Sequence, residues 1–572
     1  MNSLYRVHIH DREYNSWAFL YTNTSTPKPL TESESLINPA TLKLFSNDLI
    51  DLSTPIPTVI NSPTRNNLIP GVLMLAENKT YGRTANKKRL LYKCIPNDRF
   101  LPAFLVPYSP DIGFSKITQN RFVVFKFDNW AGAHPHGILV ENLGEVGNLT
   151  AFYEYQLYCR SLYDSISGFN KVAKQAAISS ATAIGEAGPR FPSIFSIDPP
   201  GASDQDDALS IELANPTKAI VRVYIANVFT CLETLALWKS FSNRVSTIYL
   251  PDFKRPMLPT VLSDNICSLT EGQPRQALCM EVEIDLTTNT IVVEKTKFYN
   301  QTIRVSKNYA YESPHLLANP DYQLILKCTK ALDPAIVDSA DMVAFWMIQM
   351  NVICGELLQS RGVGIFRQAS WHPFTEEPRT MSATIVALPN TLTSSTKRLI
   401  ANWRHTTGQY AVFNKDHPIE HVTMGKESYV HITSPIRRIV DLLNQIVFQV
   451  EFNLVDTISP EAKDFVEHWT QNIDYINTTM RSIKKIQLDC DMIHRCTEHP
   501  EWTEREHRGA LFDRIQRTDS MYSYMVYLQD LNILGRITTQ EKYENYSVVN
   551  VRIFVFQDEE RLHRKVRLGI VD

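Results

Sequence analysis

The sequence predicts a multidomain α+β protein in which a central α/β domain is flanked by small OB-type β-barrels. The first observation is length: 572 residues, at about 100–200 residues per domain, correspond to several domains. The second is that short strand-like runs separated by Asn, Gly and Pro turns fill 66–150 and recur in 505–572, which is typical of small barrels. The third is that 191–500 mixes strand-like and helical runs.

The segments follow one another in a clear order. Residues 1–65 carry the runs YRVHI, WAFLY and TLKLFSNDLIDL and predict an abbreviated β unit. Residues 66–150 carry five stronger runs, from GVLMLA to GILVENLG, and predict a complete small barrel. Residues 151–190 change to helical spacing and predict a helical connector. Residues 191–500 form the largest domain, and 505–572 predict a further small barrel.

Composition excludes two classes of protein. Hydrophobic residues make up 44% and charged residues 21%, which excludes a wholly disordered chain. The 58 Lys and Arg nearly balance the 61 Asp and Glu, for a net charge of −3. The chain is therefore not a basic protein that coats nucleic acid, and a site for a polyanion must be a local concentration of cations.

The sequence also predicts the compartment. No run approaches about 18 consecutive apolar residues, so we expect no membrane-spanning helix. The N-terminus has charges where a secretory signal needs an apolar core. The nine cysteines are scattered and form no CxxC motif, which favours reduced thiols. We expect a cytoplasmic or nuclear protein that is not secreted and has no membrane partner.

The strongest chemical signal is a cluster of four aspartates, Asp198, Asp204, Asp206 and Asp207. An apolar strand-like run precedes them, an alternating run follows them, and Pro199-Pro-Gly requires a turn between. Four carboxylates held this close repel one another strongly. A hard cation relieves that repulsion, and a ligand set of oxygen atoms alone suits Mg2+, with Mn2+ as the alternative ion.

The acidic segment has two other interpretations. A solvated acidic turn stays open, because D-x-D-D alone is a common surface pattern. A calcium loop of the EF-hand type is excluded, because Leu209 and Asn215 stand where that loop needs glycine and glutamate.

A second motif supplies positive charge. Ser434-Pro435 precedes an amphipathic run and predicts a helix start, with Arg437 and Arg438 in its first turn. Arg is the preferred clamp for a phosphodiester whose oxygens gain charge in the transition state. Free backbone N–H groups in the first turn would add to that site. The alternative is a capped helix with a solvated pair of arginines.

Together the two motifs are recognisable. IDPPGASDQDDAL and YVHITSPIRRIVDLL resemble the two signature segments of the ribonuclease II/R (RNB) family, processive 3′-to-5′ exoribonucleases of bacteria and of the eukaryotic exosome. VYIANV, IYLPDFKRPMLPTVLSDNICSL and FYNQTIRVSKNYAYE lie between them and are also similar. The resemblance covers about 191–490 and is greatest to exosome-type or large-DNA-virus members. It implies cold-shock-like barrels at 1–65 and 66–150 and an OB-like barrel at 505–572.

The resemblance implies a role for each residue of the two motifs. Asp198, Asp204, Asp206 and Asp207 match metal ligands, and Asp206 matches the acid most critical to catalysis. Arg437 matches the arginine that holds the reacting phosphate, and Arg438 follows it in a supporting role at the RNA.

The resemblance also implies two aromatic contacts with RNA and shows two departures from the family. Tyr249 matches the tyrosine that packs against the 3′-terminal nucleotide, and Phe366 lies near an RNA-stacking aromatic, although each could instead be a core residue. Asn227 stands where the family has an acid, and Gln487 where it has a glutamate. Both departures would reduce negative charge near the metals.

The implied function is Mg2+-dependent, two-metal hydrolysis of single-stranded RNA from its 3′ end, releasing nucleoside 5′-monophosphates. We expect a monomer, with a protein complex left open. The rival from another class is an RNA-binding or assembly subunit that kept the RNB fold and lost turnover. A DNA nuclease is a third interpretation, and only an assay can distinguish it from the exoribonuclease.

Overall fold

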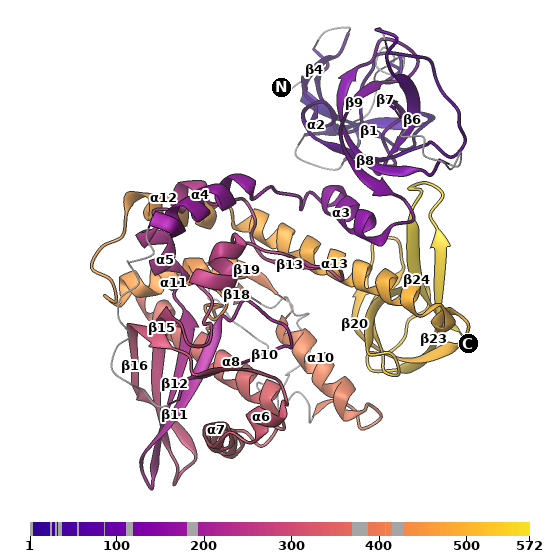
Figure 1. The fold of residues 1–572 in the computed structure, drawn as a ribbon. Coiled ribbons are helices and arrows are strands. Elements are labelled where there is room, and N and C mark those ends of the chain that lie inside the picture. Colours follow the sequence, from indigo (N-terminus) through magenta and orange to yellow (C-terminus); the bar gives the residue numbers. More distant parts are fainter. Residues whose placement is uncertain are drawn as a thin grey trace.

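The computed structural model describes residues 4–22, 26–28, 31, 37–53, 56–84, 86–109, 118–179, 193–368, 387–406, 408–414 and 428–571. Figure 1 shows two small N-terminal β units at one corner, a large mixed body, and a C-terminal sheet beside it. A long helix, α13 (Ile473–Glu498), runs from the large body to the C-terminal sheet. The predicted mixed architecture of a central α/β body flanked by small β units is confirmed.

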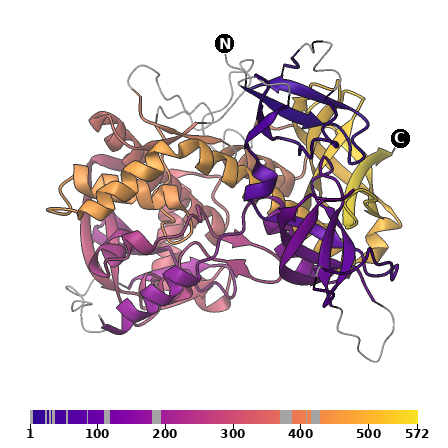
Figure 2. The ribbon, with the colours of Figure 1, turned by 90° about the horizontal axis from the view of Figure 1, so that it is seen from above.

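The N-terminal units differ in closure. The first is a four-stranded sheet in the order β2-β1-β3-β4, and the second is a closed barrel in the order β5-β6-β7-β9-β8. Figure 2 shows both units on the same side of the molecule as the C-terminal sheet. Their strands are β1 (Leu4–Ile9), β2 (Trp17–Tyr21), β3 (Leu49–Asp51), β4 (Thr58–Asn61), β5 (Ile69–Leu73), β6 (Leu90–Pro96), β7 (Phe104–Tyr108), β8 (Arg121–Asn129) and β9 (His136–Glu145), with the short helix α2 (Pro63–Asn66) between the units.

Two helices connect the barrel to the large body. They are α3 (Leu149–Cys159) and α4 (Ser167–Ser179). Asn148 caps α3, because its side chain accepts a hydrogen bond from the backbone of Ala151 at 3.0 Å. The ring of Tyr155 stacks on Phe122 of the barrel at 4.3 Å between centroids. The end of the predicted connector, 180–192, lies outside the described residues.

The large body is built on a six-stranded sheet in the order β16-β15-β12-β11-β10-β17. Both faces are buried, since Ala208 packs into one core and its neighbour Leu209 into another. The sheet strands are β10 (Phe195–Asp198), β11 (Asp207–Asn215), β12 (Lys218–Ala226), β15 (Pro274–Asp285), β16 (Thr290–Arg304) and β17 (Lys307–Ala310).

Helices and two small ribbons surround this sheet. The ribbons pair β13 (Ile248–Tyr249) with β14 (Lys254–Arg255) and β18 (Ile365–Gln368) with β19 (Gln409–Val412). The helices are α5 (Val228–Thr234), α6 (Pro314–Leu317), α7 (Pro320–Leu332), α8 (Ser339–Arg361), α10 (Ser394–Thr406), α11 (Ile439–Glu451) and α12 (Pro460–Gln471), with short helical turns at Trp238–Ser240, Leu262–Ile266 and Pro500–Thr503.

Helix α8 is the one described helix long and apolar enough, by length and composition, to cross a membrane. It contains no unbroken run of about 18 apolar residues, because polar residues such as Gln349, Asn351 and Glu356 interrupt it. Its Trp346, Met350 and Cys354 are buried in the core of the large body, and core helices commonly have this composition.

The C-terminal sheet has the order β22-β21-β20-β23-β24. Helix α13 joins it to the large body, because Ile483 and Ile486 pack in the main core whereas Met492 and Cys496 pack under the C-terminal sheet. The edge strands β22 and β24 lie against each other, although among the described sheets only the one at 69–145 is closed by hydrogen bonds. This arrangement fits the OB-like barrel expected at 505–572, since OB barrels are partly open. Its strands are β20 (Glu506–Gln516), β21 (Tyr522–Leu528), β22 (Ile533–Thr539), β23 (Val548–Gln557) and β24 (Arg564–Val571).

Candidate active site

The acidic segment forms the turn between β10 and β11. Asp198 is the last residue of β10 and Asp207 the first of β11. The backbone N–H of Ala202 donates to the carbonyl of Pro199 at 3.1 Å, and Gly201 has a φ of 80°, a conformation that favours glycine. The two strands are antiparallel, with Phe195 opposite Leu209, so the turn returns the later aspartates toward Asp198.

Three of the carboxyl groups share a buried, negatively charged environment. Burial raises the pKa of Asp198 to about 6 and that of Asp206 to about 7. Burial, followed by the charges of Asp198 and Asp206, raises the pKa of Asp207 well above its usual value. This mutual repulsion is what the spacing of the motif predicts.

Asp206 is the link to the second motif. It is 2% exposed. Its Oδ1 accepts from the backbone N–H of Ile436 at 2.9 Å and its Oδ2 from Nε of Arg437 at 3.0 Å. Nη2 of Arg437 donates to the hydroxyl of Ser434 at 2.9 Å. The side chain of Arg437 is nevertheless 45% exposed, so its guanidinium is fixed by Asp206 and still faces the open cavity.

The helix expected at Ser434-Pro435 begins later than predicted. Helix α11 starts at Ile439, and Arg438 is its N-cap, so neither arginine lies in the first helical turn. The backbone groups of the segment have other partners: Ser434 donates its N–H to Asp441 at 2.8 Å, and Ile436 donates to Asp206. The expected phosphate site at free helix N–H groups is therefore wrong. Arg438 forms an ion pair with buried Asp441 at 2.8 Å, an arrangement that supports the turn.

Asp204 is held from the β13–β14 ribbon. The hydroxyl of Tyr249 donates to its Oδ2 at 3.0 Å and Nζ of Lys254 to its Oδ1 at 2.9 Å. These two residues face each other across the ribbon. Tyr249 is 41% exposed, so the open face of its ring is accessible. Sequence reasoning missed Lys254, although its place in a hairpin bounded by Pro251 and Pro256 was a usable signal.

Tyr311 is a second residue that sequence reasoning missed. Its backbone N–H donates to the carbonyl of Asp198 at 3.1 Å. Burial, and then the charges of Asp207 and Asp198, raise the pKa of its hydroxyl. The quoted segment NYAYE contained it, but nothing in the sequence distinguished Tyr311 from Tyr309.

The RNA contact expected of Phe366 is corrected by the structure. Its ring is fully buried in the core under the central sheet and packs against Phe413, which is the core alternative left open above. Successive residues of a strand point to opposite faces. Its neighbour Arg367 therefore faces the cavity described below.

Asn227 caps a helix beside the central sheet. Its side chain caps α5 by accepting from the backbone of Thr230 at 3.1 Å, and it donates to the amides of Asn300 and Gln449. It is 1% exposed. In the described part of the chain, the hydrogen-bond partners of this side chain form an amide network that does not include the aspartates, although its neighbour Ala226 donates its backbone N–H to the carbonyl of Asp206 at 2.8 Å. The effect of the missing acid on the charge of the site stays a prediction. Gln487 differs, because it lies on α13 and lines the cavity.

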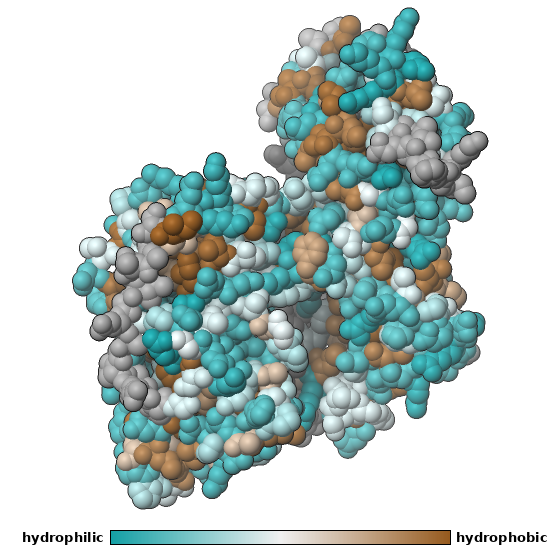
Figure 3. Space-filling view, in the orientation of Figure 1, coloured by the Kyte–Doolittle hydropathy of each residue, from teal (hydrophilic) through white to brown (hydrophobic). Residues whose placement is uncertain are grey.

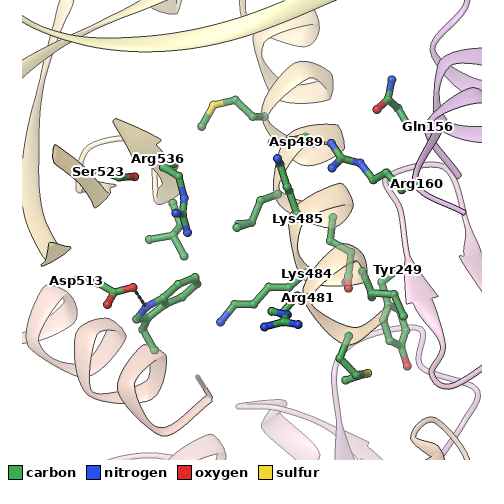
Figure 4. Close-up of a pocket in the computed structure, with 18 of the residues that line it drawn as sticks. Gln156, Arg160, Tyr249, Arg481, Lys484, Lys485, Asp489, Asp513, Ser523 and Arg536 are labelled. Carbon is green, nitrogen blue, oxygen red and sulfur yellow. Dashed lines mark hydrogen bonds and ion pairs between the residues drawn. The ribbon is translucent and has the colours of Figure 1, made fainter. Parts of the chain in front are cut away.

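A cavity of about 1690 Å³ extends from Arg437 and Tyr249 to the C-terminal sheet. Figure 3 shows a hollow between the large body and the C-terminal sheet. Figure 4 shows side chains entering the cavity from both sides. Its lining carries two carboxylates, Asp489 and Asp513, against thirteen cations. The cations are Arg160, Arg367, Arg437, Arg438, Arg481, Lys484, Lys485, Arg514, Arg517, Arg536, Arg561, Arg564 and Lys565. This is the local concentration of positive charge that a polyanion requires.

The aspartates fit a hard cation by chemistry. They supply oxygen atoms alone, and three of them repel one another when ionised. Within the described ranges no three acidic, histidine or cysteine side chains form a ready metal-binding group. The contacts explain this, since Asp204 is bonded to Tyr249 and Lys254, and Asp206 to Arg437. A bound ion would compete with these donors.

Comparison with known proteins identifies the central body. The family model described as "RNB domain" matches residues 190–324 and 316–450. Residues 190–450, the central body, are therefore similar to the RNB domain. Both signature segments lie within the match, and the resemblance to the ribonuclease II/R family is confirmed. The exosome-type or viral character stays a prediction.

The curated relatives are distant in sequence. Ribonuclease R of Thermotoga maritima is 23% identical over 434 residues, covering 62% of this chain and 58% of the relative. Exoribonuclease 2 of Aeromonas hydrophila is 25% identical over 312 residues, covering 44% of this chain and 46% of the relative. The matched region thus spans about half the length of these relatives.

Solved structures share the fold around the RNB domain. RNase R of Mycoplasma genitalium, solved in complex with ribose-methylated single-stranded RNA, has a TM-score of 0.68 at 16% identity and covers 99% of this chain and 100% of its own. Yeast Ssd1, described as a pseudonuclease, has a TM-score of 0.56 at 14% identity and covers 85% of this chain and 66% of its own. At these identities the likeness concerns the fold alone.

Proposed function

We propose that this chain is a hydrolytic, processive 3′-to-5′ exoribonuclease that degrades single-stranded RNA to nucleoside 5′-monophosphates. The observation that carries the proposal is the placement of the Asp206–Arg437 pair at a cavity lined by thirteen cations. A strand of RNA has the charge that this lining attracts. An arginine fixed at the cavity can hold the phosphate that reacts.

Each side chain has a defined task in this proposal. Arg437 orients the reacting phosphate with the exposed part of its guanidinium, while Asp206 fixes the guanidinium through Nε. Tyr249 offers an exposed ring on which the 3′-terminal base stacks. Lys254 and Tyr249 hold Asp204 in place.

Asp198, Asp204, Asp206 and Asp207 are the residues that would hold Mg2+, or Mn2+ in its place. When bound, the ion supplies Lewis-acid chemistry, which activates water and stabilises the leaving 3′ oxygen.

The proposal is tested with one RNA carrying a label at either end. With Mg2+ present, 3′-labelled RNA should release labelled mononucleotide from the first time point, and 5′-labelled RNA should shorten to a small final fragment. Chelation of the metal should stop both. Internal fragments of intermediate size at early times would indicate an endonuclease, and equal cleavage of DNA would remove the specificity for RNA.

Replacing Tyr249 by Ala should lengthen the final fragment. Stacking of a base on an aromatic ring contributes about 1–3 kcal/mol. Losing this stacking weakens the binding of short RNA most, because long RNA keeps its contacts along the cavity. The measurement is end-product length on a denaturing gel. Tyr249→Phe is the matched control, since it keeps the ring and loses only the bond to Asp204. Identical fragments from Tyr249→Ala and the parent would mean that the ring does not contact RNA.

The stabilisation by Mg2+ should grow as pH rises. The folded pKa values of Asp198 and Asp206, about 6 and about 7, lie above those of unfolded aspartate. Without metal, the free energy of unfolding therefore falls as pH rises from about 4, where unfolded aspartate ionises, to about 7, where the folded carboxyl groups ionise. A cation that binds the ionised group relieves this cost. The increase in melting temperature on adding Mg2+ should be larger near pH 8 than near pH 5.5. An increase that does not change with pH would place the metal elsewhere.

A second candidate function is an RNA-binding subunit with weakened catalysis. It is favoured by Gln487, which stands where the family has a glutamate. Such a protein would bind RNA tightly in the assay above and leave it intact with every divalent cation.

A further inference from the structure

Lys484 is a buried cation without a counter-ion in the described part of the chain. It lies on α13, and Figure 4 shows its side chain entering the cavity. Its Nζ is buried, has no hydrogen-bond partner there, and lies 3.4 Å from the centre of the Trp403 ring. The carboxylate of Asp513, whose charge acts on Lys484, accepts a hydrogen bond from Nε1 of Trp403 at 3.2 Å. No ion pair between Asp513 and Lys484 is found among the described residues.

Arg367 is a second buried cation at the same wall. It is 7% exposed, and its Nη1 lies 2.9 Å from Nε2 of His431. Arginine can only donate, so Nε2 must accept. The proton of His431 is then on Nδ1, which donates to the hydroxyl of Tyr410 at 2.7 Å. The described partner of Arg367 is therefore a neutral imidazole, which does not balance its charge.

The fold joins the two elements that carry these cations, and both side chains line the same cavity. Asn477 of α13 accepts from the backbone N–H of Tyr410 at 2.7 Å and donates to its carbonyl at 2.8 Å. These bonds fix the β18–β19 ribbon, which carries Arg367, against the helix that carries Lys484. After burial itself, the charge of Arg367 is the largest influence that lowers the pKa of Lys484, to about 7. Keeping two like charges together in a buried site is costly unless an anion binds between them.

We propose that Arg367 and Lys484 form a subsite for one backbone phosphate of the RNA, separate from the phosphate held by Arg437, with Trp403 as its wall. The inference rests on the proposed function for the identity of the anion. An ammonium and a guanidinium fork together supply the donors that a phosphodiester accepts. The other lining cations lead a continuous strand to this point, which a small free anion would not need.

The test measures RNA binding in EDTA, where no cleavage competes. A set of short single-stranded RNAs carries one uncharged methylphosphonate linkage each, at successive positions from the 3′ end. In the parent protein, one internal position should weaken binding about 10-fold, the size of a charge-assisted contact. In Lys484→Gln, binding of unmodified RNA should fall by a similar factor, and that position should have no further effect. Lys463→Gln, on the exposed side of α12, is the control.

Three further variants separate this role from a structural one. The affinity of the parent for RNA should decline between about pH 6 and about pH 8 as Lys484 loses its charge. Lys484→Arg should keep the affinity and reduce this decline, because arginine stays charged throughout. The groups facing Lys484 are Arg367, Arg536 and Asp513. Lys484→Met should raise the melting temperature while it weakens RNA binding, since it removes a buried unpaired charge. Arg367→Gln should abolish the effect of the methylphosphonate at the same internal position of the RNA.

The outcomes discriminate between the proposals. Equal affinity of Lys484→Gln and the parent for every RNA, or the same positional profile in both, would overturn the subsite. A lower melting temperature for Lys484→Met would make Lys484 a structural residue and would also overturn it. If Arg367→Gln does not fold, the Lys484 variants decide. A parent that shows the positional profile but never cleaves RNA would refute the exonuclease and leave the subsite standing.

Discussion

Asp206→Asn is expected to reduce RNA cleavage by about 100- to 1,000-fold, the usual effect of removing one fixed electrostatic group from an active site. The buried carboxylate holds Nε of Arg437 and is one of the proposed metal ligands. Asn keeps its size and can still accept from the backbone of Ile436. It loses the charge that fixes Arg437 and attracts the cation. Binding of RNA in EDTA should change little, because the cavity keeps all its cations.

The measurement pairs single-turnover cleavage with equilibrium binding of the same RNA. Asp464→Asn on the exposed face of α12 is the matched control and should leave both values unchanged. The melting temperature of metal-free Asp206→Asn should not fall, since the burial that raises the pKa of Asp206 disfavours its charge. A parallel loss of binding and cleavage would assign Asp206 a structural role instead.

Arg437→Gln is expected to have an effect on cleavage of similar size, with a distinct pH signature. The charge of Arg437 lowers the pKa of Asp206 against the effect of burial. Without that charge the pKa of Asp206 rises, so the residual activity should require higher pH than that of the parent. Arg437→Lys should restore the pH profile but only part of the rate, because an ammonium cannot replace the planar fork.

These variants are compared by the pH dependence of the single-turnover rate at saturating RNA. Arg361→Gln, at the exposed end of α8, removes the same charge far from the aspartates and should leave the profile unchanged. An Arg437→Gln enzyme with the parent's rate would show that another cation holds the reacting phosphate. A lower rate with an unmoved pH profile would show that Arg437 does not act on Asp206.

Prediction from the sequence succeeded where structure is local. The runs of short strands, the helical connector and the mixed central body follow from side-chain periodicity. The helix start at Ser434-Pro435 was wrong because distant partners, Asp206 among them, bond the backbone groups that a helix would have left free. The RNA contact predicted for Phe366 was wrong because the sequence shows that strand neighbours face opposite ways, but not which face is the core.

The acidic turn is what the sequence by itself determined. Pro199, Pro200 and Gly201 require the chain to reverse, and the strands on either side return Asp206 and Asp207 toward Asp198, since backbone preferences over ten residues suffice for this. The tertiary structure alone decided the rest. Asp206 and Arg437 are 231 positions apart. The lining cations come from the end of α3, from β18, from the segment before α11, from α13 and from the C-terminal unit. A net charge of −3 conceals that lining, because composition sums over the whole chain whereas an electrostatic field depends on which charges the fold brings to one wall.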